Sequence, residues 1–242
     1  MLLNHLRPEQ LQDAVSRNIP VLIPAGVMEY HGPHLPLGTD YLIAETICEK
    51  VSHRCECLLG PGLPFGPTMS WAAGPDEGEI DFEPEPFFQY SVSIFSHLLK
   101  LGFRRIYILQ HHQGHEGLQS LCLQHAARQS IWQMAKQWAP GWGRQPEPPD
   151  PSVFHCIQIA ELDSFSDYPS SQVERVPVGH GGKGETQLIL AAYSDLVRIE
   201  ALDDWRGPLP EWLKDAREAS KEDGEKWIEF CVKGWVSELT RS

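Results

Sequence analysis

Short apolar runs alternate with longer segments of helical periodicity along most of this chain, and this alternation restricts the fold more than any other feature. The apolar runs predict strands at 21–24, at the start of 57–66, at 104–109 and at 153–160. Apolar residues at helical spacing predict helices at 7–17, 41–54, 87–100, 118–138, 185–197 and 210–239. Strands separated by helices pair in parallel within one sheet. The sequence therefore predicts a layered α/β fold.

The segments between these elements are polar or rich in Gly and Pro. Thr39 or Asp40 is placed to cap the helix that starts at 41, and Gly102 is placed to end the helix before it. We predict irregular structure at 68–86 and 163–184, and a surface loop at 139–151. Because no internal repeat or linker interrupts the alternation, we expect a single domain over residues 1–242.

The charge balance and hydropathy exclude several functional classes. Acidic residues outnumber basic ones by 33 to 20, which gives a formal net charge of -13 and disfavours a nucleic-acid partner. No apolar stretch approaches the roughly 18 residues that a membrane-spanning helix needs. The N-terminus has no basic region followed by an apolar run, so we expect no signal peptide. We therefore expect a soluble, cytoplasmic protein without a nucleic-acid or membrane partner.

Three loops that follow predicted strands or precede predicted helices concentrate imidazole and carboxylate side chains, which are ligands for zinc or manganese. These residues are Glu29, His31, His34 and Asp40; His111, His112, His115 and Glu116; and His180, Lys183 and Glu185. Chemistry in open parallel sheets collects at the carboxyl ends of strands. Glu29 and His31 share one face of an extended segment, and Asp40 heads a helix, where a bridging carboxylate is well placed. Alternatively, Asp40 only caps its helix and Glu29 is a solvated loop residue.

Two of these loops resemble motifs of the creatininase family. The segment EYHGPHLPLGTD at 29–40 resembles the family motif E-x-H-G-P-H-L-P-x-x-T-D, including its spacing. The segment GHGGKGET at 179–186 is similar to the family's G-H-A-G-x-x-E-T-S, and GFRRIYIL at 102–109 resembles the strand before its N-G-H-G-G-N loop. Residues 63–66 and 223–227 show weaker similarity to sequences of the family.

The resemblance implies a three-layer αβα sandwich with a mainly parallel central sheet and two divalent metal ions per chain, either zinc, manganese or iron. It also implies hydrolysis of a small polar carbonyl substrate by a metal-bridging hydroxide, and a homo-oligomer such as a hexamer. Relatives open a cyclic amide, remove a formyl group, trim a peptide or hydrolyse a C–C bond in an oxidised inositol. We expect C–N bond hydrolysis of a cyclic amide or formamide. The alternatives are ring opening of a cyclic diketone and, ranked lower, a non-catalytic metal-binding protein.

The family motifs also imply site roles, residue by residue. Glu29 resembles a ligand of the first metal, His31 a ligand of the second and Asp40 the bridging ligand. His180 resembles the family's catalytic histidine, which transfers a proton to the leaving group.

The middle loop, QHHQGHEG, departs from the family pattern because it carries no acid two residues after His112. We therefore expect Glu185 to supply the remaining ligand. If the family's loop is aligned from the end of the predicted strand, His112 is the histidine ligand. If the alignment is shifted by three residues, the ligand is His115. We prefer His112, because it lies nearer the rigid strand.

This departure favours a relative with another substrate over a creatininase proper. His34, His115 and Lys183 are weaker candidates for substrate contact, and Lys183 can equally face solvent. A cysteine-nucleophile amidase is a rival reading that we rank low, because Cys122 and Cys156 fall in a predicted helix and a predicted strand rather than in an accessible, electropositive loop.

Overall fold

Four parallel strands form the central sheet in the order β2-β1-β3-β4. The computed structural model describes residues 1–136, 141, 144, 152–168 and 179–241. Its strands are β1 (Val21–Ala25), β2 (Leu58–Leu59), β3 (Ile106–Gln110) and β4 (Ile157–Ala160). Its α-helices are α1 (Pro8–Ser16), α2 (Thr39–Ser52), α3 (Pro84–Leu101), α4 (Leu118–Ala135), α5 (Lys183–Ala192) and α6 (Lys221–Thr240).

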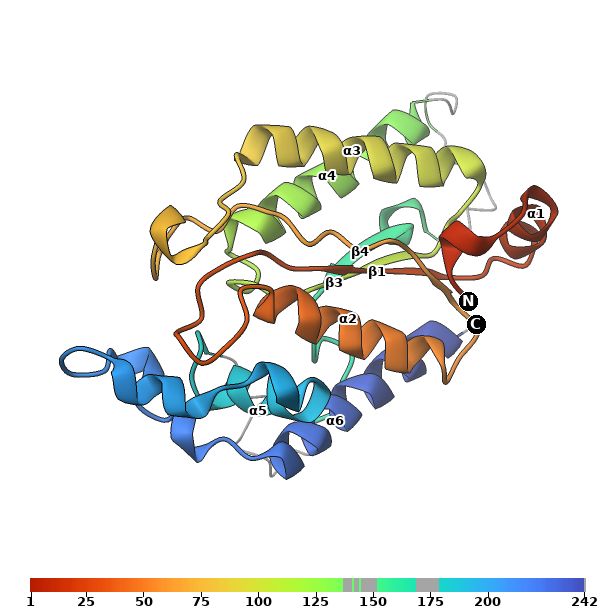
Figure 1. Cartoon of the computed structure of the whole chain (residues 1–242). Helices are drawn as coiled ribbons and strands as arrows, with labels where there is room; N and C mark the ends of the chain where they lie inside the picture. The colour runs from red at the N-terminus through yellow and green to blue at the C-terminus, as the bar shows by residue number, and fades with distance from the viewer. Residues whose placement is uncertain (137–140, 142–143, 145–151, 169–178, 242) are drawn as a thin grey trace.

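Helices cover both faces of the sheet. Figure 1 shows α3 and α4 above the strands and α2, α5 and α6 below them. Every residue of β1 and β3 is buried, as expected for strands that are apolar on both sides. One apolar cluster, which includes Phe95 and Phe103, lies under α3 and α4, and a second, centred on Trp235 of α6, lies on the other face. The predicted three-layer αβα sandwich is confirmed.

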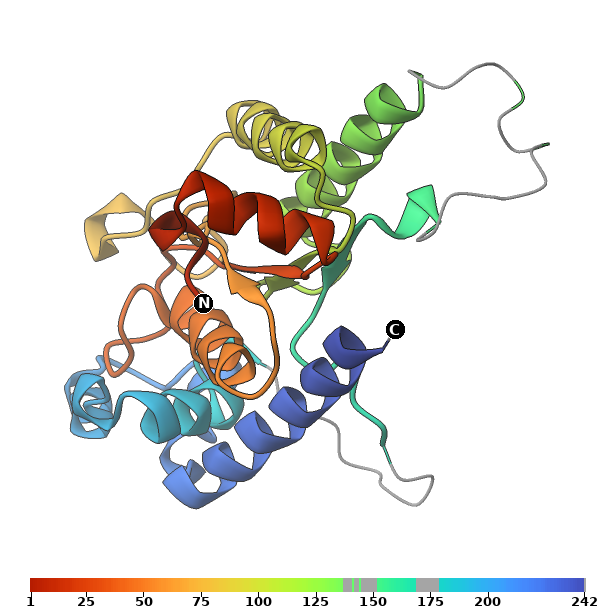
Figure 2. The ribbon, with the colours of Figure 1, turned by 90° about the vertical axis from the view of Figure 1, so that its right-hand side faces the viewer.

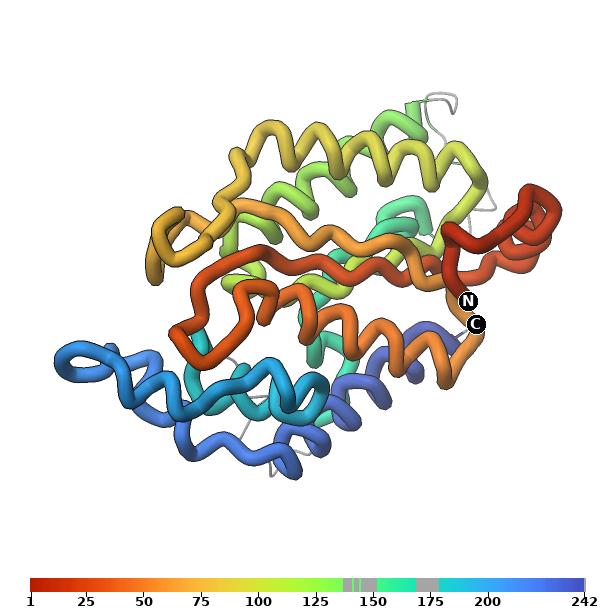
Figure 3. Tube along the Cα trace, in the orientation of Figure 1, coloured from red at the N-terminus to blue at the C-terminus, as the bar shows by residue number. Residues whose placement is uncertain are grey.

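The ends of the strands divide the molecule into two regions. In Figure 3 the two termini lie close together at one end of the sheet, while the loops after β1 and β3 turn at the opposite end. Figure 2, viewed from the terminal end, shows α1 beside the sheet on the side of α3. The register pairs Ala25 with Gln110, so β1 and β3 end level with each other. The loops that carry the candidate residues therefore start side by side.

Three local predictions are wrong. The helix predicted over 210–239 is interrupted: 3-10 turns at Glu211–Leu213 and Ala216–Glu218 precede α6, whose first turn is capped by the Ser220 hydroxyl, which accepts the Asp223 N–H. The first half of the strand predicted at 153–160 is a 3-10 turn, Val153–His155.

The cap predicted at Thr39 or Asp40 is also wrong, because Gly38 is the residue that precedes α2. The Thr39 hydroxyl donates instead to Pro36 O, and the Asp40 side chain is left for other contacts. The cap predicted at Gly102 is confirmed, with a left-handed φ of 108°. Apart from 141 and 144, the loop predicted at 139–151 lies outside the described residues, as does the part at 169–178 of the irregular segment predicted at 163–184.

The end of β1 touches the first turn of α2 backbone to backbone. A Cβ built at Gly26 would lie 2.4 Å from Tyr41 N and 2.6 Å from Tyr41 Cα. Backbone atoms on both sides of this contact cannot rotate away, so the close approach requires glycine. The contact fixes the position of Asp40, the residue before Tyr41, relative to the loop that carries Glu29.

We expect Gly26→Ala to lower the free energy of unfolding by about 1–3 kcal/mol, because overpacking forces the strand and the helix apart. Urea unfolding of the variant measures the loss. Gly74→Ala is the matched control, since a Cβ at Gly74 meets nothing within 4 Å and should change stability by less than about 0.5 kcal/mol. Equal stability of the two variants would contradict the close-packing argument.

Candidate metal centre

The loop after β1 buries two polar side chains of the first motif. Glu29 and His31 are each 1% exposed. The Glu29 N–H donates to Leu37 O at 2.9 Å, which closes the loop on itself. The His31 Nδ1–H donates to the Glu29 carbonyl at 3.0 Å, and this contact turns the Nε2 atom of the ring toward the interior of the loop cluster. A ring held in this way presents one nitrogen lone pair for binding a cation.

Two helices contribute carboxylates from their first turns. Asp40 lies in the first turn of α2 and Glu185 in the first turn of α5, and both side chains are buried. The positive end of a helix dipole stabilises an anion in this position. The Gly181 N–H also donates to Glu185 Oε2 at 2.6 Å. The starts of the two helices therefore favour the charged form of both acids, and the Gly181 N–H adds to this effect at Glu185.

The Asp40 carboxylate contacts one imidazole with each oxygen. Its Oδ1 atom lies 3.2 Å from His31 Nε2, and its Oδ2 atom lies 3.0 Å from His112 Nδ1. His112 follows β3 directly, and its carbonyl accepts a hydrogen bond from the Gln110 side chain. One carboxylate from α2 thus joins the loop after β1 to the loop after β3.

The described residues form two donor groups that share Asp40. Glu29, Asp40 and His112 make one group, and His31, Asp40 and Glu185 make the other, with the ligand atoms of each within 4.8 Å of one another. Glu29 Oε2 is buried without a hydrogen bond, although His112 Nδ1 lies only 3.2 Å away. Buried oxygens and imidazole nitrogens that crowd together in this way match the ligand chemistry of divalent cations, so the donor set fits a pair of such ions.

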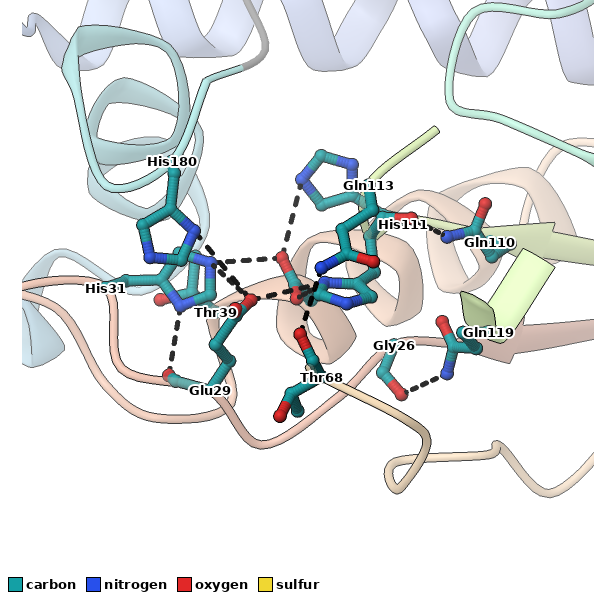
Figure 4. A network of polar contacts seen from close by, with 12 residues as sticks. Gly26, Glu29, His31, Thr39, Thr68, Gln110, His111, Gln113, Gln119 and His180 are labelled. Atoms are coloured by element: carbon teal, nitrogen blue, oxygen red, sulfur yellow. Dashed lines mark hydrogen bonds and ion pairs between the residues drawn. The ribbon is translucent and has the colours of Figure 1, made fainter. Parts of the chain in front are cut away.

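His180 lies over the edge of this cluster and inside an aromatic enclosure. Its ring stacks on His31 with centroids 4.3 Å apart, and its other contacts are edge-to-face with Trp71 at 5.1 Å and Trp212 at 4.9 Å. The Nε2–H donates to Tyr30 O at 2.7 Å, and Nδ1 lies 3.7 Å from Glu29 Oε2. Figure 4 shows His180 and His31 one above the other, with the Glu29 carboxylate between them and the remaining polar groups. His180 also falls within reach of Glu29 and His31 as a third possible donor group.

A cavity of about 470 Å³ opens onto the centre. The residues that line it include candidate ligands and His180, together with Trp71, His111, Gln113, Glu161 and Asp163. No sequence motif predicts a role for Trp71, and His111 is predicted only as one of several imidazoles in its loop. Trp71 follows Met69 and Ser70, which both have positive φ, so a strained turn presents its ring to the cavity. His111 is buried beside His112, and its Nε2 atom lies 3.1 Å from Glu185 Oε1.

The three weaker candidates for substrate contact lie away from the cavity lining in the described residues. His34 Nε2 hydrogen-bonds Thr186 Oγ1 inside the protein, and burial lowers the pKa of His34 to about 4. His115 is exposed and its Nδ1 atom lies 3.6 Å from Glu161. Lys183 Nζ lies 3.8 Å from Glu218. The substrate-contact roles of the three stay predictions. His112, and not His115, lies beside Asp40 and Glu29.

The carboxylates change how the imidazoles hold protons. Burial alone would lower the pKa of His31, but Asp40, Glu185 and Glu29 outweigh it and raise the pKa to about 10. Burial also opposes charge on His112, and Asp40 and Glu29 raise its pKa to about 9. In turn His31 and His112 outweigh burial and hold the pKa of the Asp40 carboxyl well below its usual range. Without a metal, protons on the imidazoles balance the buried carboxylates.

His180 behaves in the opposite way. Burial, followed by repulsion from the charge on His31, lowers the pKa of His180. A cysteine-nucleophile amidase would need an accessible thiol with a lowered pKa. Burial instead raises the pKa of the Cys122 and Cys156 thiols, and neither residue lines the cavity.

Comparison with known proteins identifies the group to which this fold and centre belong. The model of the family described as "Creatininase: Creatinine amidohydrolase" matches residues 4–239. The chain belongs to the creatininase family. It is a hydrolase of that family, as the motifs at 29–40 and 179–186 predict.

Among creatininase-family relatives, the chain is 26% identical to creatinine amidohydrolase of Pseudomonas putida, over 88% of this chain and 86% of the relative. It is 25% identical to 3-dehydro-scyllo-inosose hydrolase of Thermotoga maritima, over 84% of this chain but 60% of that longer protein. Among solved structures, a creatinine amidohydrolase superposes with a TM-score of 0.75 at 21% identity, over 100% of this chain and 98% of that one. A mutant creatininase of "Zn-Zn type" gives 0.77 at 20% identity, over 98% and 96%. These structural matches confirm the fold.

In the described part of the chain, no helix is long and apolar enough to span a bilayer.

The raised pKa values predict that the metal-free protein loses stability as the pH increases. The folded-state pKa values of His31 and His112 exceed the ordinary value of 6.5, so their contribution is complete below that pH and is lost as the pH passes through about 9 to 10. Between pH 7 and 8.5 we expect the free energy of unfolding to fall by about 1.4 kcal/mol per pH unit for each imidazole that keeps its proton. Urea unfolding with a chelator present measures the slope.

The His112→Gln variant is the control for this slope, because it keeps a hydrogen-bond donor but removes one of the two protons. Its slope should be about half that of the unsubstituted chain. A free energy of unfolding that stays constant or rises from pH 7 to 8.5 would show that the imidazoles do not hold these protons.

Proposed function

We propose that this chain hydrolyses a C–N bond, in a cyclic amide or a formamide, of a small polar carbonyl substrate, with two divalent ions held by the candidate centre. The observation that carries the proposal is the Asp40 carboxylate, whose two oxygens face His31 and His112 at 3.2 Å and 3.0 Å. A carboxylate shared between two donor groups is the arrangement that holds two ions close together.

In this proposal Glu29, Asp40 and His112 hold one ion, and His31, Asp40 and Glu185 hold the other. Zinc, manganese and iron all suit imidazole and carboxylate ligands. Solved creatininases named for bound Mn and for a Zn-Zn site support the first two choices. When bound, such a pair polarises a carbonyl group and activates water at neutral pH. The protein residues position these donors, and burial keeps bulk water from competing for them.

His180 is the residue that we propose to move the proton. Its Nε2–H is committed to Tyr30 O, which fixes the ring and leaves Nδ1 directed toward the cluster. The lowered pKa leaves this nitrogen free to accept a proton near neutral pH and to give it to a leaving amine. Trp71 and Trp212 pack against the ring and limit the access of water to it. The imidazole is thus held in one orientation between the acceptor at Tyr30 and the cavity.

The main alternative is hydrolysis of a C–C bond in a cyclic diketone. The hydrolase of Thermotoga maritima named for 3-dehydro-scyllo-inosose supports it, with 25% identity. Both reactions begin with attack on a carbonyl carbon, and the cavity of about 470 Å³ accommodates a small ring of either kind. We also propose that the chain assembles as a homo-oligomer, as the family resemblance implies, and that it acts in the cytoplasm. A metal-binding protein without turnover is the remaining alternative.

A substrate panel tests the proposal directly. We expect metal-reconstituted protein to contain about two ions per chain and to hydrolyse at least one member of a panel of cyclic amides and formamides. Elemental analysis and product detection by mass spectrometry give the two readouts. Asp40→Asn is the matched control, because it keeps the shape of Asp40, removes the shared charge and should lose both metal and turnover.

Each outcome of this panel separates the candidate functions. Turnover of cyclic diketones alone would support C–C hydrolysis and refute the C–N assignment. Two bound ions with no turnover of any class would favour the metal-binding protein. Metal content in Asp40→Asn equal to that of the unsubstituted chain would refute the shared carboxylate.

His180→Ala tests the proton-transfer role. We expect this variant to keep both ions and to lose turnover by roughly 100- to 10,000-fold, which is the usual contribution of general acid–base catalysis. His180→Gln should not restore turnover, because an amide cannot accept and release a proton near neutral pH. Turnover and metal content are measured on the same samples. Release of an ion from His180→Ala would make His180 a ligand, and turnover within a few-fold of the unsubstituted chain would require another proton route.

A further inference from the structure

His111 is a buried imidazole that the ligand assignment leaves without a role. It is the first residue after β3, and its N–H donates to Ala25 O at 3.1 Å, so its backbone continues the pairing of β3 with β1. The side chain is 8% exposed and reaches across to α5. A side chain on the end of a central strand is held more rigidly than one on a free loop.

In the described residues, the side-chain hydrogen bonds and ion pairs of His111 go to Glu185 and Asp40, the two carboxylates of the donor group that contains His31. Its Nε2 atom lies 3.1 Å from Glu185 Oε1 and 3.9 Å from Asp40 Oδ1. The other oxygen of the same carboxylate, Glu185 Oε2, accepts the Gly181 N–H at 2.6 Å and lies 3.5 Å from His31 Nε2. The Oε2 atom of Glu185 is therefore directed at His31, and the Oε1 atom is held by His111.

The loop after β3 shows why such a contact is needed. The position two residues beyond His112 is Gly114, whose φ is +63°, and a Cβ there would lie 3.3 Å from Glu161 Oε1. A carboxylate-bearing side chain at this position would carry backbone strain and crowd another acid. The third carboxylate comes instead from α5, which belongs to a different layer and has its own packing partners on α6 and α2. A link between α5 and the end of β3 is then required to keep that carboxylate in place.

We propose that His111 is a positioning residue that orients Glu185 for the ion held with His31 and Asp40. This inference rests on the proposed metal function. His111 donates its Nε2–H to Glu185 Oε1 and so fixes the rotation of the carboxylate, with Oε2 facing His31. Contacts of this kind raise metal affinity by about 10- to 100-fold. Among the hydrogen bonds and ion pairs of the described residues, His111 contacts neither Glu29 nor His112, and its 3.9 Å contact with the shared Asp40 is longer than its 3.1 Å contact with Glu185. We therefore expect the larger effect on the ion held with Glu185.

Metal titration of four proteins tests the assignment: the unsubstituted chain, His111→Ala, His111→Gln and His115→Ala. Binding of Mn²⁺ is measured by competition with a fluorescent chelator, and the visible spectrum of the Co²⁺-loaded protein reports the ligand geometry. We expect His111→Ala to bind one of the two ions about 10- to 100-fold more weakly and to change the Co²⁺ spectrum. His111→Gln should recover most of the affinity, because its amide N–H replaces the lost donor. His115→Ala, an exposed position in the same loop, should bind both ions normally.

The outcomes separate this inference from the proposed function. Absence of metal from the unsubstituted chain refutes the proposed function itself. Two ions bound normally by His111→Ala, or an equal loss for both ions, refutes the positioning role while leaving the function intact. If His111→Gln binds as weakly as His111→Ala, the imidazole is itself a ligand and the positioning role is wrong. In a Glu185→Gln background, His111→Ala should cause no further loss, and an additional loss would show that His111 acts through another group.

Discussion

The Asp40 carboxylate sets the geometry on which the rest of the centre depends. In the described structure, Asp40 belongs both to the donor group with Glu29 and His112 and to the donor group with His31 and Glu185. Its position requires the contact of Gly26 with the first turn of α2, and its two partners require β1 and β3 to end level with each other. The arrangement of the sheet, the path of the loop after β1 and the start of α2 therefore act together on a single carboxylate.

Burial of three acids in one place is unfavourable unless positive charge accompanies them. In this chain the positive charge comes from protonated imidazoles and from the N-termini of α2 and α5. The cluster is thus compatible with the fold before any cation binds. A divalent ion that enters the cluster displaces protons from His31 and His112, so metal affinity and pH are coupled at this centre.

Local sequence patterns predicted the features that depend on nearby residues. The motif at 29–40 supplies Glu29, His31 and Asp40 within twelve residues, and the structure brings these residues together as the motif suggests. Their metal-binding roles stay predictions. The alternation of apolar runs and helical patterns was enough to predict a layered fold with a parallel sheet, and the family resemblance predicted the two helical layers.

Features that depend on tertiary contacts could not be predicted in this way. In the run Gln110-His111-His112-Gln113, the direction of each imidazole depends on where β3 ends and on the positive φ of Gln113. The partner of His111 is 74 residues away in the sequence. Trp71 reaches the cavity through a strained turn at Met69 and Ser70 that no apolar pattern signals. The break before α6 was missed because the helix begins at a cap, in which the Ser220 hydroxyl accepts the Asp223 N–H, and apolar periodicity does not signal this contact.

The two donor groups differ in how firmly the fold anchors them. Glu29 and His112 flank the central strands, and Asp40 is packed against the end of β1, so this group comes apart only when the middle of the sheet opens. The other group depends on Glu185, which a ten-residue helix in an outer layer supplies. A local opening that detached α5 would remove Glu185 while the strands stay paired. In the proposed two-ion state, the ion held with Glu185 would therefore exchange faster than the ion held with Glu29 and His112, and a protein sample dialysed against a chelator for different times would pass through a state with a single ion.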